Sequence, residues 1–90
     1  MLVPMNDTCW MRLANGWTVS LQTDTPPAIC CIAAWPTRQD NLAWASNTFK
    51  EVDLFDFGDG RTDYRCWSYG DVREALKKIA AATSPNEHKM

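Results

Sequence analysis

The dipeptide Asn15-Gly16 constrains the fold more than any other feature, because it lies between two runs of strand-forming residues. A two-residue type I′ turn needs positive φ at both central positions, and Asn-Gly is the pair that tolerates this conformation best. The sequence therefore predicts a β-hairpin over residues 10–22. A two-residue turn sets Arg12 opposite Val19. In that register the face expected to pack on the core carries Trp10, Ala14, Trp17, Val19 and Leu21.

Residues 28–35 form an uncharged apolar run of strand length, with Pro26-Pro27 before it and Pro36 after it. Proline does not fit inside a central strand, so these residues mark the ends of the run. A short apolar run without alternation is typical of a strand buried on both faces. A buried helix is the alternative, but the short length of the run and the prolines at its ends favour a central strand.

Residues 37–50 carry a weaker signal. Residues 37–41 are polar and indicate a loop. After them, Leu42, Trp44 and Phe49 either anchor an irregular segment against the core or belong to one short helical turn capped by Asp40-Asn41.

A second turn signal, Gly58-Asp59-Gly60, follows residues 51–57. A two-residue loop would set two aspartates opposite each other, whereas a three-residue loop gives an opposite-charge pair and is preferred. The preferred register pairs Val52 with Cys66, Asp53 with Arg65 and Leu54 with Tyr64.

The C-terminal part of the chain predicts a helix that begins after Ser68 as N-cap, with Asp71 three residues later. Ser84-Pro85 ends the helical pattern. One apolar stripe is formed by Val72, Ala75, Leu76, Ile79 and Ala80.

Together these elements predict an α+β fold, in which an antiparallel sheet of about four to five strands carries one C-terminal helix packed on a face. The sheet is built from two hairpins and the central strand. Ninety residues suit a single domain over residues 1–90, with an ordered core at about 9–83 and a flexible tail at 84–90. No apolar stretch approaches the roughly 18–20 residues that span a membrane, so no membrane partner is expected.

The four cysteines favour reduced thiols over a disulfide or zinc framework. Residues 1–7 lack the basic and apolar parts of a signal peptide. Adjacent residues of a strand, such as Cys30 and Cys31, point to opposite faces. The only histidine is His88. We therefore expect reduced, mostly buried thiols, no metal, no cofactor and a cytoplasmic location. One disulfide or a metal site is the alternative.

Residues 51–63 carry five acidic side chains against Arg61, a local charge of −4 in a chain of net charge −2. This cluster is either a solvated strand edge that discourages aggregation or an acidic surface for a basic groove, with carboxylates in place of nucleic-acid phosphates. Calcium is disfavoured because the EF-hand spacing is absent. The residues expected to bind a partner are Glu51, Asp53, Phe55, Asp56, Phe57, Asp59, Asp63 and Trp44.

The five tryptophans have two interpretations. Most fill the core of a thin sheet, and any surplus is available to a partner, because exposed tryptophan is enriched in protein interfaces. An acidic chain does not favour direct binding of nucleic acid.

No catalytic motif is found. The sequence lacks a nucleophile elbow, a P-loop, a zinc-protease motif and a dinucleotide fingerprint. Asp56-Phe57-Gly58 spells the kinase magnesium motif by chance, since 90 residues leave no room for a kinase. The sequence therefore predicts a non-enzymatic protein, with a small enzyme or metal protein using Cys30, Cys31 or Cys66 as an alternative.

Four segments of the chain resemble small proteins without assigned activity that phages and prophages of proteobacteria carry. They are Trp10 with residues 13–20, residues 31–37, residues 55–58 and residues 65–68. The resemblance spans residues 10–82. It implies a binding protein, monomeric or homodimeric, that inhibits or modulates a host protein in the host cytoplasm. Anti-CRISPR proteins are one such class, and a nucleic-acid-binding defence complex is one such target. A structural component of a phage particle is the alternative.

Overall fold

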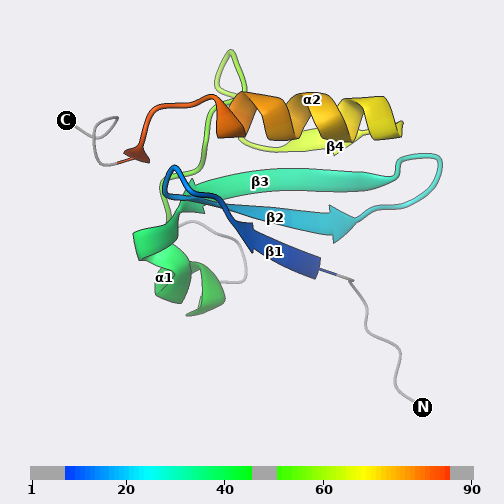
Figure 1. The fold of residues 1–90 in the computed structure, drawn as a ribbon. Helices are drawn as coiled ribbons and strands as arrows, with labels where there is room; N and C mark the ends of the chain where they lie inside the picture. The colour runs from blue at the N-terminus through cyan, green and yellow to red at the C-terminus, as the bar shows by residue number, and fades with distance from the viewer. Residues whose placement is uncertain (1–7, 46–50, 86–90) are drawn as a thin grey trace.

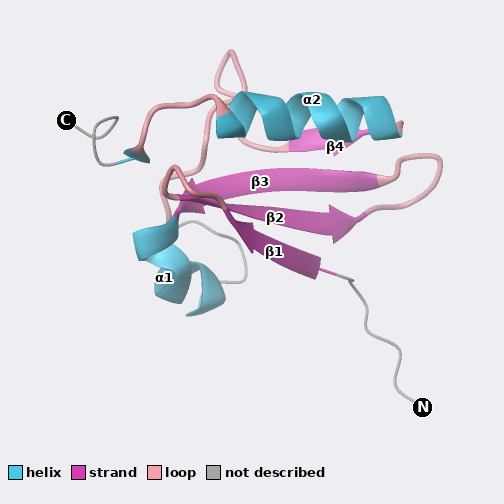
Figure 2. Cartoon of the chain, in the orientation of Figure 1, coloured by secondary structure: helices cyan, strands magenta, loops and turns pink. Residues whose placement is uncertain are grey.

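The computed structural model describes residues 8–45 and 51–85 (Figure 1). It confirms the predicted α+β fold, with one antiparallel sheet in the order β1-β2-β3-β4 and α2 packed on it (Figure 2). The elements are β1 (Thr8–Arg12), β2 (Trp17–Thr23), β3 (Cys30–Pro36), a 3₁₀ helix η1 (Thr37–Gln39), α1 (Asp40–Ala45), β4 (Tyr64–Cys66) and α2 (Tyr69–Ala80).

The two helices lie on opposite faces of the sheet (Figure 1). Because side chains alternate along a strand, each face has its own core. The α2 face carries a cluster built from Trp17, Val19, Cys30, Ile32, Ala34, Cys66, Ala75 and Ile79. The α1 face carries a smaller cluster of Trp35, Ala43 and Val52, with Trp10 and Leu54 beside it.

The first hairpin forms where it was predicted, but the predicted register is wrong by one residue. Arg12 pairs with Thr18, not Val19. Gly16 has φ +95°, its amide donates to the Leu13 carbonyl at 3.1 Å, and Leu13 donates to the Trp17 carbonyl at 2.8 Å. This is a type I turn followed by a glycine bulge, which adds one residue to the loop. A one-residue slip moves every side chain of β1 to the other face, so Trp10 lies on the α1 face.

The predicted central strand is confirmed as β3, which lies between β2 and β4. The predicted pairing of residues 51–57 with β4 is wrong. β4 pairs with β3 instead, Cys66 opposite Cys30 and Arg65 opposite Cys31. The second turn does form, because Phe57 donates to the Arg61 carbonyl at 2.8 Å. The pairs Val52–Cys66, Asp53–Arg65 and Leu54–Tyr64 are therefore absent.

Residues 40–45 adopt the short helix that was one of the two alternatives. Asp40 does not cap it. Its Oδ1 accepts a hydrogen bond from Trp35 Nε1 at 2.8 Å, and its Oδ2 accepts one from Arg12 Nε at 2.7 Å. Asp40 thereby fixes the start of α1 to the sheet.

The C-terminal helix begins as predicted, since Ser68 Oγ accepts from the Asp71 amide at 3.2 Å. Ala75 and Ile79 of the stripe are buried, but Ala80 is exposed and does not belong to the buried face. Phe49, His88 and the rest of the predicted tail at 86–90 lie outside the described residues, as do residues 1–7.

Candidate functional site

The acidic segment, residues 51–63, runs along the outer side of β3 and leads into β4. The Phe55 amide donates to the Ala34 carbonyl at 2.8 Å. The ring of Phe55 packs edge to face against Trp17 with 5.2 Å between centroids, and Phe57 packs against Phe55 at 5.0 Å. The rings of Phe55 and Phe57, predicted to bind a partner, thus anchor the segment to the core on the α2 face.

All five acidic side chains of this segment are exposed: Glu51, Asp53, Asp56, Asp59 and Asp63. Two of them also hold the backbone in place. Asp53 Oδ2 accepts from Gln39 Nε2 at 2.9 Å, which joins the segment to η1. Asp56 Oδ1 accepts from the amides of Gly58 and Gly60, at 2.7 and 3.1 Å, and so shapes the turn. These contacts hold the segment at Asp53 and at the turn over residues 58–60.

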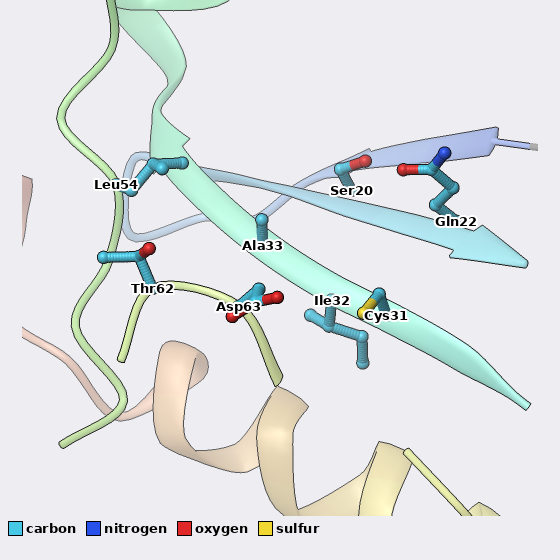
Figure 3. Close-up of a pocket in the computed structure, with 8 residues that line it drawn as sticks. All are labelled: Ser20, Gln22, Cys31, Ile32, Ala33, Leu54, Thr62 and Asp63. Carbon is cyan, nitrogen blue, oxygen red and sulfur yellow. The ribbon is translucent and has the colours of Figure 1, made fainter. Parts of the chain in front are cut away.

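A cavity of about 240 Å³ lies between this segment and the sheet (Figure 3). Of the five predicted acidic residues, Asp63 lines it. Figure 3 shows Asp63 and Thr62 at one wall, Ser20 and Gln22 on β2 at the other side, and Cys31 at the end. Polar groups from β2, β3 and the acidic segment therefore share one opening.

Arg65 and Asp24 form an ion pair beside this cavity, with 2.9 Å between Nε and Oδ2. The backbone hydrogen bond from Thr25 and the charge of Arg65 lower the pKa of Asp24. Cys31 Sγ lies 3.7 Å from Asp24 Oδ2, and burial raises the pKa of this thiol. Cys31 therefore stays protonated at neutral pH and is a poor nucleophile.

Among the residues that the structure describes, three large aromatic side chains are exposed. Trp44, predicted as a partner-binding residue, is 81% exposed on α1, and Tyr69 and Trp67 are 78% and 54% exposed at the start of α2. Arg65 lies 5.9 Å from the Trp67 ring centroid. Sequence reasoning missed Trp67 and Tyr69. Their exposure could have been predicted, because they lie on either side of the N-cap Ser68 and outside the apolar stripe of the helix.

The cysteines show no metal or disulfide arrangement in residues 8–45 and 51–85. All four thiols are free, with Cys30 and Cys66 buried and Cys9 exposed. In the same residues, no three histidine, cysteine or acidic side chains gather around one point as metal ligands would. None of the described helices has the length and apolar character to cross a bilayer.

Comparison of the chain with protein-family models, with curated proteins and with solved structures finds no match.

Proposed function

We propose that this chain is a non-enzymatic binding protein that modulates a host protein, of the kind that phages use against host defences, and that the acidic segment is its binding surface. One observation carries the proposal. The acidic segment turns its phenylalanines inward and all five of its carboxylates outward. Carboxylates carried on a backbone that is already ordered attract a basic groove, and the segment loses little conformational freedom on binding.

The side chains around the segment support the same function. Trp67 stands exposed at the far end of β4 from Asp63, so an apolar anchor lies beside the acidic surface. Tryptophan is enriched among the residues that contribute most to binding at protein interfaces. The partner that this chemistry fits is a protein with a basic, nucleic-acid-binding surface.

The test uses neutral variants that leave the backbone contacts of the segment intact. The triple variant Glu51→Gln, Asp59→Asn, Asp63→Asn removes three charges and spares Asp53 and Asp56, whose carboxylates hold neighbouring residues. The control is Glu74→Gln, because Glu74 is an exposed acidic residue on α2, outside the acidic segment. Each protein is immobilised and used to capture partners from a lysate of the host.

We expect the wild type and the Glu74→Gln control to retain one host protein, and the triple variant to lose it. Added salt should weaken the wild-type complex, since exposed charges are screened. A nucleic-acid duplex should compete for the same partner. Equal retention by the triple variant, or a complex indifferent to salt and to the duplex, would show that the acidic segment is not the binding surface.

A further inference from the structure

The outer edge of β1 is open in the described part of the chain, because β1 stands at one end of the sheet. The Leu13 amide donates to the Trp17 carbonyl. Hydrogen-bonded pairs alternate along an antiparallel ladder, so Met11 and Cys9 also bond to β2. The backbone groups that point away from β2 are therefore those of Thr8, Trp10 and Arg12.

Within residues 8–45 and 51–85, this edge lacks the usual protection against pairing. Edge strands that stay single commonly carry a lysine, a proline or a bulge. β1 reads Thr-Cys-Trp-Met-Arg and pairs with β2 in unbroken register, so it has none of these. Its one charged side chain, Arg12, is balanced by Asp40 with 2.7 Å between Nε and Oδ2.

Apolar side chains flank the edge on both faces of the sheet. On the α2 face, a cavity of about 350 Å³ opens between the strands and the helix, and Cys9, Leu21 and Val72 are among its lining residues. On the α1 face, Trp10 and the exposed Trp44 pack edge to face with 6.0 Å between centroids. A strand added to β1 covers apolar surface on both sides.

We propose that a second copy of this chain occupies the edge, by antiparallel pairing of β1 with β1 about a two-fold axis at Trp10. Trp10 then lies opposite Trp10 of the second copy, Thr8 opposite Arg12, and Cys9 opposite Met11. Charge favours this register, because Arg12 never faces Arg12 and the net charge of −2 per chain gives little repulsion. The pairing joins two four-stranded sheets into one.

The size of the contact sets its strength. A stable interface buries about 800 Å² on each partner. A large aromatic side chain contributes about 150–250 Å² when fully buried, so five paired residues, Trp10 among them, with Trp44 beside them stay below that area. We therefore expect a dimer that forms at micromolar concentration and dissociates on dilution. This proposal is independent of the proposed function.

The experiment measures molar mass by light scattering and sedimentation over a dilution series of the full chain. Wild type should change from dimer to monomer on dilution. Cys9→Lys places a charge next to the two-fold axis of the contact, from a side chain that is exposed in the single chain. Thr8→Pro removes one outward donor and leaves the ladder to β2 intact. Both variants should be monomeric at every concentration, and Ala81→Lys, on the exposed helix end, should behave as wild type.

Amide hydrogen exchange gives a readout on the unmodified chain. Exchange of the Trp10 and Arg12 amides should slow as the concentration rises, while that of exposed amides in the loop at 58–60 should not. A wild-type monomer at all concentrations overturns the proposal, and so does a dimer that survives both β1 variants. Protection of these amides only after addition of a foreign protein would assign the edge to a different partner.

Discussion

Asn15 joins the first hairpin to the end of α2 through one side chain. Its Nδ2 lies 3.0, 3.2 and 3.3 Å from the carbonyl oxygens of Ile79, Ala80 and Ala82. The last carbonyls of a helix have no donor within the helix, so this amide supplies one. Trp17 Nε1 adds a donor to the Thr83 carbonyl at 2.9 Å. The hairpin and the helix end are thus stabilised together.

Replacing Asn15 with aspartate should destabilise the protein, because a carboxylate would face three carbonyl oxygens in place of a donor. We expect Asn15→Asp to lower the free energy of unfolding by about 1–3 kcal/mol at neutral pH. Acid should restore part of the lost stability, since a protonated carboxyl donates a hydrogen bond. Urea unfolding at both pH values measures the effect, with the exposed Asn41→Asp as control. Equal stability of Asn15→Asp and wild type would contradict the role given to this side chain.

Asp40 gives the protein a predictable response to acid. Burial opposes its ionisation, but hydrogen bonds from Arg12 and Trp35 outweigh burial and hold the pKa below 3.8. The unfolded chain therefore takes up this proton at higher pH than the folded chain. The stabilisation is complete above 3.8 and is lost as the pH falls through the folded pKa.

Asp40→Asn should be less stable than wild type at neutral pH and should lose less stability in acid, because it no longer binds that proton. The free energy of unfolding, followed against pH, should show the two curves converging below 3.8. Asp59→Asn, at the exposed loop, controls for the loss of one carboxylate. Parallel curves for Asp40→Asn and wild type would show that Asp40 does not contribute in this way.

At the scale of elements, the first hairpin shows what a local pattern can predict. The Asn15-Gly16 pair predicted the place of the turn, because the glycine conformation is a local property. The register also depends on Asn15, whose side chain is held by α2, 64 positions away in sequence. Both faces of β1 carry large apolar side chains, so the hydrophobic pattern did not select between registers.

The acidic segment shows the same limit in the candidate site. Its charges and its glycine turn were readable from sequence, and all five carboxylates are exposed as a surface site requires. The strand beside which it lies could not be predicted from the sequence. That strand is β3, whose edge has backbone groups that must be paired by whichever segment lies next to it in the assembled fold. Phe55 and β4 share that edge, and the inward phenylalanines follow from it.

Asp56 separates the structural from the electrostatic role of this segment. Asp56→Asn keeps the Oδ1 acceptor for Gly58 and Gly60 and removes the charge, so its stability should stay within about 0.5 kcal/mol of wild type. Asp56→Ala removes the acceptor and should lower the free energy of unfolding by about 1 kcal/mol. Thermal and urea unfolding measure both. Equal losses in the two variants would mean that the charge, not the turn, stabilises this loop.

At the scale of the whole molecule, the sheet separates two cores of unequal size. α2 covers the larger core, and the short α1 covers part of the other face. Of the five tryptophans, Trp17 and Trp35 are buried and Trp44 and Trp67 are exposed. The composition indicated a surplus of tryptophan for such a small core. Which of them fill it depends on strand register and helix placement, and these are properties of the assembled fold.

Cys66 makes the stability of this core depend on pH in the alkaline range. Burial raises the pKa of its thiol from 9.0 to about 12. Unfolding places the thiol in water, where it ionises near its ordinary value. Between 9.0 and about 12 the unfolded chain therefore binds fewer protons at this site than the folded chain, so the stability due to Cys66 falls as the pH rises.

Cys66→Ser should be less stable than wild type at neutral pH, because a hydroxyl replaces a thiol in an apolar site. Its free energy of unfolding should decline less steeply above pH 9.0, since serine has no thiol to ionise. Urea unfolding under reducing conditions, measured from neutral to alkaline pH, compares the two slopes, and Cys9→Ser controls for the loss of one thiol. A slope for Cys66→Ser as steep as that of wild type would locate the alkaline sensitivity elsewhere in the molecule.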